Sequence, residues 1–373
     1  MAGTARPTPE PGAESRIHRM PTEPSLRRLI AEDGTLQGEV PAGLAEADLL
    51  EIHRLLHLSR AFDDQAFKLV RQGRISFYAG SRGHEGAQVG SGYALEGDDW
   101  VFPSPHRELG VHFAKGATPF EMMSHFFGRA TDPTRGRQMP NHFGSRALNI
   151  VPPSTAVGTR IPHAAGVGFA ARCKGDPAVG VAYFGDGATS MGEFHIGLNF
   201  AAVFNSQTVF FCINNLWAIS VPLERQMGVA TIAERAAAYG FPGVLVDGND
   251  PLATYAVMKT ALDRARAGDG PTLIEARVVR LCAHTSFDDE SRYRDAAETA
   301  EGEKLDSLVR YGAFLEKQGL WDADREAELA ATARRQIDEA TAEAEASPLP
   351  EPDTLHRHVF HEGAQPSATD AGS

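Results

Sequence analysis

Apolar runs and helix-patterned segments alternate through the second half of the chain. The runs are short and nearly unbroken, and they cover residues 178–184, 208–213, 244–246 and 271–279. Continuous apolar runs of this length are typical of parallel strands that are covered on both faces. The segments between them place apolar residues three and four positions apart, as amphipathic helices do. The alternation predicts an α/β fold with a mostly parallel sheet flanked by helices.

The first half of the chain is predicted to be mainly helical. From Glu46, apolar residues recur at helical spacing to about Gly73. A long stretch without such spacing, residues 136–159, contains Met, Phe, Ile and Val and is expected to be a packed functional loop. Further helices are expected at 87–95, 118–128, 161–172, 232–239, 251–268, 303–319 and 322–346, with a short apolar segment at 100–102.

One expected helix, residues 190–204, is apolar on nearly all sides. Gly192 and Gly197 would let another helix approach it closely. A helix with this pattern is buried either in a core or in an interface between chains.

The two ends of the chain differ in composition from the rest. Residues 1–24 are rich in Pro, Ala and Glu, and residues 363–373 are low in apolar content. Both segments are predicted to be disordered, because they offer little surface to bury. Residues 25–45 are expected to form an extended arm that lies over a neighbour, and residues 25–362 are predicted to form a single domain.

Composition excludes several classes of protein. The net charge of −13 argues against a general nucleic-acid or anionic-membrane surface. The three cysteines are far apart and form no CxxC pair, so neither a disulfide framework nor a zinc site is expected from them. No apolar run is long enough to span a membrane and the N-terminus has no signal-peptide pattern, so a cytoplasmic location is predicted.

Polar residues follow two of the predicted strands directly. Gly185-Asp186-Gly187 ends the first run, and Asn214-Asn215 ends the second. Parallel strands place their carboxyl ends at one edge of the sheet, where open α/β sheets bind ligands, so Asp186 and Asn215 should converge there. Carboxylate and amide oxygens suit Mg²⁺ that holds phosphate oxygens.

This pairing of Gly-Asp-Gly with Asn-Asn resembles the thiamin-diphosphate-binding motif. From about Leu49 to Phe360, the chain is similar to the α subunit of the E1 component of 2-oxo acid dehydrogenase complexes. GRISFY and GRQMP look more like branched-chain than pyruvate enzymes, although pyruvate and acetoin enzymes share the cofactor motif. The matching stretches are GRISFY, GRQMPNHFG, IPHAAGVGFAAR, GDGATSMGEF, FFCINNLWAISVP and AHTSFDDESRYR.

The resemblance implies roles for individual residues. Asp186, Asn215 and the main-chain carbonyl of Trp217 would ligate Mg²⁺. Arg107 would bind the diphosphate, and His106 stands where the family usually has Tyr, in a turn that is one residue longer. His284 would be the catalytic histidine, and Phe77, His106 and Thr155 would contact the substrate. The implied cofactor-binding set is Pro105, His106, Arg107, Thr155, Ala156, Val157, Gly185, Asp186, Gly187, Ala188, Thr189, Ser190, Met191, Asn215, Leu216, Trp217, Ala218, Ile219 and His284.

The resemblance also implies an activity and partners. The reaction would be oxidative decarboxylation of a 2-oxo acid such as 3-methyl-2-oxobutanoate, with acyl transfer to a lipoyl group on the E2 component. A β subunit would complete the site in an α₂β₂ heterotetramer, and this chain alone would be inactive. No partnership with nucleic acid or membrane is expected.

Two other classes of function stand as alternatives. One is a NAD-binding oxidoreductase, but the turn after Phe184 reads Gly-x-Gly-x-x-x-x-Gly and carries an acid, which would repel a pyrophosphate without a metal. The other is a subunit that retains the fold without catalysis. Without the family match, His284 would be read as a surface histidine in a charged loop.

Overall fold

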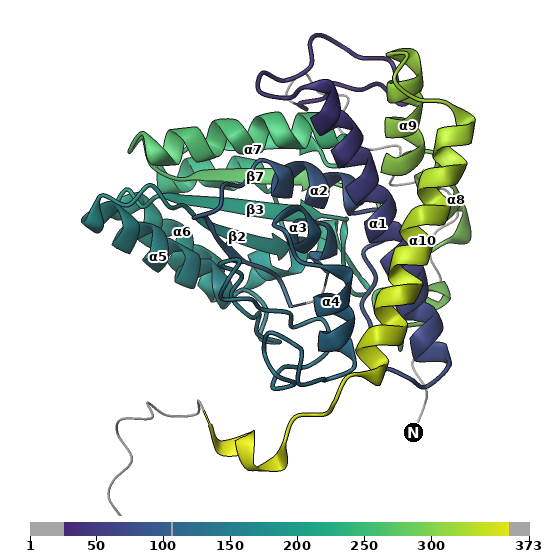
Figure 1. Cartoon of the computed structure of the whole chain (residues 1–373). Coiled ribbons are helices and arrows are strands. Elements are labelled where there is room, and N and C mark those ends of the chain that lie inside the picture. Colours follow the sequence, from purple (N-terminus) through teal and green to yellow (C-terminus); the bar gives the residue numbers. More distant parts are fainter. Residues whose placement is uncertain (1–25, 106, 358–373) are drawn as a thin grey trace, which may run out of the picture.

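A five-stranded parallel sheet forms the centre of the fold (Figure 1). The computed structural model describes residues 26–105 and 107–357, so the predicted arm at 1–24, His106 and the predicted tail at 363–373 lie outside the described residues. All neighbouring strands in the sheet are parallel, which confirms the predicted fold class. The strand order is β1 (Trp100–Phe102), β2 (Gly180–Gly185), β3 (Thr208–Asn214), β7 (Thr272–Arg277) and β6 (Gly243–Asp247).

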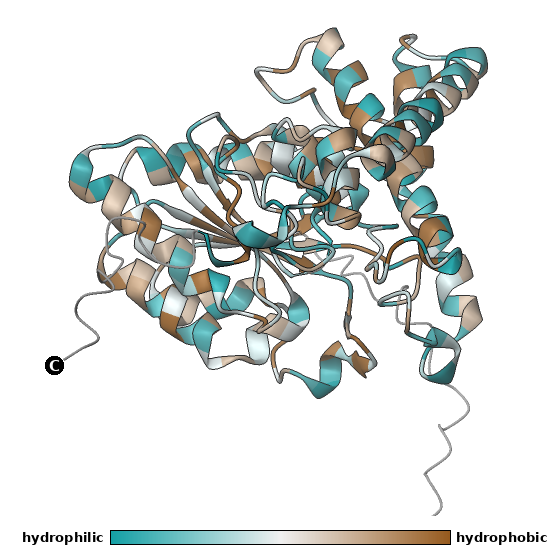
Figure 2. Ribbon diagram, turned by 60° about the horizontal axis from the view of Figure 1, so that its bottom comes forward, coloured by the Kyte–Doolittle hydropathy of each residue, from teal (hydrophilic) through white to brown (hydrophobic). Residues whose placement is uncertain are grey.

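Alternate residues of the sheet serve two separate cores. Ala182 of β2 and Phe210 of β3 pack on one face, against α5 (Arg160–Lys174) and α6 (Gly192–Val203). Val181 and Phe211 pack on the opposite face. That face is covered by α2 (Glu85–Tyr93) and α7 (Pro251–Arg266), and α1 (Glu46–Arg71) packs against α2. The strands are accordingly brown in the hydropathy colouring, between helices of mixed colour (Figure 2).

The C-terminal helices lie along one side of the sheet (Figure 1). α10 (Ala323–Ala346) packs against α1 and against α4 (Pro119–Phe126). The helix predicted at 303–319 corresponds to α9 (Ser307–Lys317), which begins later than predicted because the Asp306 carboxylate accepts a hydrogen bond from the Leu308 N–H and caps it. The preceding helix, α8 (Ala296–Glu303), was not predicted.

Several short elements complete the described chain. α3 (Leu109–Ala114) was not predicted, because its six residues are too few to show a period. The predicted helix at 232–239 is a 3₁₀ helix, η4 (Ala233–Tyr239). The remaining elements are η2 (Asp186–Ser190), η3 (Leu223–Arg225), η5 (Glu290–Arg292), η6 (Pro352–His356) and the antiparallel pair β4 (Trp217–Ala218) and β5 (Val221–Pro222).

Helix α6 has one buried and one exposed face. Phe194 and Leu198 are fully buried, whereas Ile196 and Val203 are 63% and 68% exposed. Within this chain, α6 is therefore not buried on all sides. An apolar exposed face is what a helix at an interface between chains presents.

The segment that precedes α1 lies on this chain rather than on a neighbour. Arg27 forms a parallel bridge with Val246 of β6, and its N–H donates to the Leu245 carbonyl at 3.0 Å. The Asp250 carboxylate accepts hydrogen bonds from the backbone N–H groups of Leu29 and Ile30.

No helix in the described part of the chain combines the length and the apolar composition that crossing a bilayer requires.

Candidate active site at the carboxyl edge of the sheet

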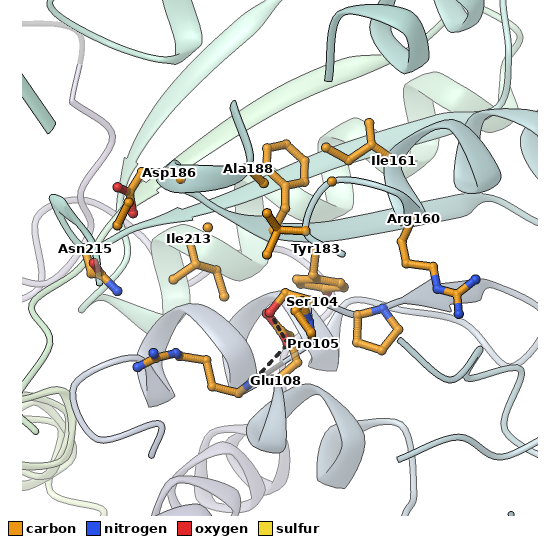
Figure 3. Close-up of a pocket in the computed structure, with 18 of the residues that line it drawn as sticks. Ser104, Pro105, Glu108, Arg160, Ile161, Tyr183, Asp186, Ala188, Ile213 and Asn215 are labelled. Atoms are coloured by element: carbon orange, nitrogen blue, oxygen red, sulfur yellow. Dashed lines mark hydrogen bonds between the residues drawn. The ribbon is translucent and has the colours of Figure 1, made fainter. Parts of the chain in front are cut away.

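A cavity of about 240 Å³ lies at the carboxyl ends of β2 and β3 (Figure 3). Its other walls come from the turn around Pro105, from the loop that precedes α5, and from the segment around β4. The sequence-predicted residues that line it are Pro105, Arg107, Ala156, Val157, Gly185, Asp186, Gly187, Ala188, Asn215, Trp217, Ala218, Ile219 and His284.

Asp186 is a buried carboxylate at the start of η2. Gln226 donates to its Oδ2 at 2.9 Å, and within the described residues no salt bridge reaches it. Burial raises the pKa of Asp186, although the Gln226 hydrogen bond and the charges of Arg280 and Arg107 oppose that rise. A buried carboxylate without a paired cation favours the binding of a metal ion.

Hydrogen bonds to both its nitrogen and its oxygen orient the side-chain amide of Asn215. Its Nδ2 donates to His84 Nε2 at 2.9 Å, and its Oδ1 accepts from the Trp217 N–H at 3.1 Å. His84 is fully buried, and its Nδ1 lies 3.3 Å from the Ser81 carbonyl, so Nδ1 carries the proton and Nε2 accepts. Burial, with the nearby charges of Arg107 and Arg280, lowers the pKa of His84 well below its usual value and keeps the ring neutral.

The backbone after Asn215 is held in an unusual shape. Leu216 and Ile219 adopt φ values of 69° and 56°, in the left-handed region that non-glycine residues rarely occupy. The Leu216 N–H donates to Asn214 Oδ1 at 2.9 Å, and the Asn214 Nδ2 donates to Glu275. Asn214 therefore shapes the turn, whereas Asn215 faces the cavity.

Two residues from distant loops meet beside the cavity. Arg107 donates from Nη2 to His284 Nδ1 at 2.7 Å and to the His284 carbonyl at 3.0 Å. Its Nη1 donates to the Gly80 carbonyl at 3.0 Å. The His284 N–H in turn donates to Asp288 Oδ2 at 2.8 Å, which holds the loop in place.

This chain is similar in sequence to known proteins over most of its length. Residues 53–353 match the family model described as "Dehydrogenase E1 component". The chain belongs to this dehydrogenase family. That membership confirms the family resemblance seen in the sequence, and it removes the basis for a nicotinamide-binding alternative.

Three relatives of this E1 chain illustrate the similarity. It is 41% identical over 320 residues to the 2-oxoisovalerate dehydrogenase subunit alpha of Bacillus subtilis, covering 85% of this chain and 97% of that protein. It is 42% identical over 311 residues to the 3-methyl-2-oxobutanoate dehydrogenase subunit alpha of Mycobacterium tuberculosis, covering 82% of each. It is 39% identical over 321 residues to the pyruvate dehydrogenase E1 component subunit alpha of Staphylococcus aureus, covering 85% and 84%.

Some sequence-predicted residues of the E1 chain do not line this cavity. The exposed Thr155 places its hydroxyl 3.4 Å from His142 Nε2. Thr189 is buried and its hydroxyl donates to the Asp186 carbonyl at 2.8 Å, so it stabilises the turn that carries Asp186. Phe77 stacks on Phe287, with ring centroids 6.2 Å apart. Ser190, Met191 and Leu216 also lie outside the lining, the first two of them exposed.

Sequence reasoning missed several residues of the site. His84 and Gln226 contact Asn215 and Asp186 directly, and Arg160 lines the cavity. Nothing in the sequence pointed from His84 to Asn215, which is 131 positions away. Gln226 carries no motif that could have marked it.

Proposed function

We propose that this chain is the α-type subunit of an E1 2-oxo acid dehydrogenase that depends on thiamin diphosphate and Mg²⁺. Together with a β subunit, it decarboxylates a branched-chain 2-oxo acid, 3-methyl-2-oxobutanoate, and passes the acyl group to a lipoyl disulfide on E2. The disulfide is reduced as one sulfur takes the acyl group and the other a proton, and CO₂ leaves. The observation that carries the proposal is the convergence of Asp186, Asn215, Arg107 and His284 on one cavity.

The donor set at this edge fits a magnesium ion. Asp186 supplies a buried anionic oxygen, and the Asn215 carbonyl and the Trp217 main-chain carbonyl supply neutral ones, all of them hard ligands. The Trp217 indole donates to Glu298 at 3.0 Å, so its side chain is engaged with α8 and only its main chain takes this role. Gly187 lets this turn lie close to the β4 segment, because a Cβ there would lie 2.9 Å from the Ala218 Cβ.

Thiamin diphosphate, when bound, supplies the electron sink for the loss of CO₂. The chain's own residues provide position and charge. Arg107 is a fixed cation for a diphosphate oxygen, since two carbonyls and His284 already orient its guanidinium. Since His284 Nδ1 accepts from Arg107, the neutral ring carries its proton on Nε2, the atom that would donate to a 2-oxo oxygen.

The substrate assignment rests on sequence similarity to the relatives. The two relatives named for branched-chain substrates are 41% and 42% identical to this chain, and the GRISFY and GRQMP stretches point the same way. Pyruvate is the second candidate, supported by the relative that is 39% identical. We place Phe77 and Thr155 in the substrate-binding region, where a partner chain would bring the remaining wall. We assign no role to His106.

The proposed assembly is an α₂β₂ heterotetramer in the cytoplasm that engages the lipoyl domain of E2. One feature supports a shared site: α6 exposes an apolar face with Ile196 and Val203. Residues 25–362 act as a single domain in this proposal. Nucleic acid and membrane have no part in it.

The test uses the chain co-expressed with its β subunit. CO₂ release would be measured on 3-methyl-2-oxobutanoate and on pyruvate with an artificial electron acceptor, with and without thiamin diphosphate and Mg²⁺. Cofactor-dependent release with a higher kcat/KM on 3-methyl-2-oxobutanoate is expected. A higher value on pyruvate would replace the substrate assignment, and failure of the assembly to bind thiamin diphosphate would leave the chain a non-catalytic subunit.

A further inference from the structure

Two histidines of α1 face one carboxylate of α10, away from the cavity described above. His53 and His57 are separated by one helical turn, and Glu326 lies in the first turn of α10. His53 Nε2 lies 2.8 Å from Glu326 Oε2, and His57 Nε2 lies 3.0 Å from Glu326 Oε1. With one ligand atom taken from each residue, the three atoms lie within 4.8 Å of one another, and none of the three residues lines the cavity of Asp186.

The surroundings hold these side chains firmly. His53 is fully buried, and its ring meets those of His57 and Trp321 edge-on, at centroid distances of 4.6 Å and 5.1 Å. The Trp321 indole N–H donates to Glu326 Oε2 at 2.7 Å. Second contacts of this kind orient the ligands of a metal ion in advance.

Two buried nitrogens of the cluster, His53 Nδ1 and His57 Nε2, have no hydrogen-bond partner among the described residues. His57 Nε2 nevertheless faces the Glu326 carboxylate, 3.0 Å from its Oε1. A hydrogen-bonded network that served only to join two helices would satisfy its buried atoms. The cluster also opens on one side, because the Glu326 side chain is 38% exposed and a groove of about 210 Å³ begins at His57.

We propose that His53 Nε2, His57 Nε2 and Glu326 Oε1 form a binding site for a divalent transition-metal ion, with Zn²⁺ as its preferred occupant. Two imidazoles and one carboxylate form the ligand set of many three-residue zinc sites, and water completes the fourth position. Histidines at i and i+4 on one helix face are the spacing that such sites use.

The metal would tie α10 to α1. Beyond its C-terminal end, α10 leads to Pro348, whose carbonyl accepts from the Ala130 N–H at 2.9 Å, at the start of the segment that runs on to Ala156 and Val157. The site itself lies at the opposite end of α10 from that contact. It does not depend on the proposed function, since it involves none of those residues.

The test titrates Zn²⁺ and Co²⁺ into the full chain, free of any histidine tag, in excess Mg²⁺. Mg²⁺ prefers oxygen ligands and would occupy other sites without competing for imidazole. One equivalent of Zn²⁺ is expected to bind and to raise the melting temperature. Glu326→Gln and His57→Gln are each expected to weaken binding by at least about 100-fold, since loss of an outer-shell partner alone costs up to that much.

Glu328→Gln is the matched control, because Glu328 is an exposed carboxylate on the same helix. It should bind Zn²⁺ as the unchanged chain does. X-ray absorption on the unchanged chain keeps the test decisive if a variant fails to fold: two imidazole ligands on the zinc support the site. Absence of stoichiometric binding, an all-oxygen shell, or equal affinity in Glu326→Gln and Glu328→Gln would overturn it.

Discussion

Arg107 donates a hydrogen bond from its guanidinium to the imidazole Nδ1 of His284, although the two residues lie 177 positions apart in the sequence. The contact joins the turn after β1 to the loop after β7 at one cavity. It fixes which nitrogen of the neutral histidine carries the proton, and it holds the arginine beside Asp186 and Asn215. Each member of this set can therefore be tested separately.

Asp186→Asn should separate metal binding from folding. We expect the affinity for Mg²⁺ with thiamin diphosphate to fall by at least about 100-fold, because a direct ligand contributes more than an outer-shell partner. The metal-free variant should be no less stable than the unchanged chain, since a buried uncompensated charge has been removed. Cofactor titration and thermal unfolding measure the two quantities, and unchanged cofactor affinity would refute the metal assignment.

The same residue predicts a pH dependence. The folded-state pKa of Asp186 is raised above the usual 3.8, so its contribution to stability is present below pH 3.8 and is lost as the pH rises through the raised value. In the metal-free chain, the free energy of unfolding should therefore contain a component that declines over this window. Asp186→Asn should remove that component in denaturant titrations at several pH values, and a profile identical to that of the unchanged chain would contradict the prediction.

His284→Asn should impair turnover rather than cofactor binding. General acid–base groups contribute about 100- to 10,000-fold to rate, so kcat should fall within that range. Thiamin diphosphate affinity should change little, because Arg107 keeps its bond to the Gly80 carbonyl. Steady-state rates and a cofactor titration of the assembled enzyme distinguish the two effects, and an equal loss in both would make His284 a structural residue.

His84 should act through Asn215. His84→Leu leaves the Asn215 Nδ2 without its acceptor, and metal affinity should fall by about 10- to 100-fold. His84→Gln retains an oxygen that can accept from Nδ2 and should restore most of the affinity. If the leucine and glutamine variants bind Mg²⁺ equally well, the orientation of Asn215 does not depend on this bond.

Ile196→Glu should disrupt the proposed association with a β subunit. A charge on the exposed apolar face of α6 would be desolvated in an interface, which is costly without a partner. Val309→Glu on α9 is the control, since Val309 is 70% exposed and Ile196 is 63% exposed. Co-purification should be lost in the first variant only, and its survival in both would place the interface elsewhere.

The strands could be predicted well from the sequence because burial on both faces leaves a pattern in the strand residues themselves. Continuous apolar runs such as residues 208–213 reflect burial on both faces, and the observed β3 extends the run by one residue, to Asn214. The convergence of Asp186 and Asn215 followed from strand direction alone. The start of α9 was placed too early because one capping aspartate, Asp306, outweighed a helical pattern that continues across it.

The surroundings of the site could not be predicted in the same way. His84 and Gln226 act through hydrogen bonds to single atoms across 131 and 40 positions, and no periodicity encodes such contacts. The family resemblance supplied Arg107 and His284, but their mutual hydrogen bond emerged only in three dimensions. Whether Thr155 and Phe77 contact a substrate stays a prediction.

The left-handed residues Leu216 and Ile219 have a consequence for how tightly this edge binds its ligands. A backbone in this conformation is less stable locally by roughly 1–3 kcal/mol per residue. That cost is part of the free energy of folding and does not arise when a ligand binds. Segment 215–219 is thus shaped before any ligand arrives, so little further ordering is required on association. Glycine at either position would relax the turn, and the resulting freedom would appear as a more unfavourable entropy of cofactor binding in calorimetry.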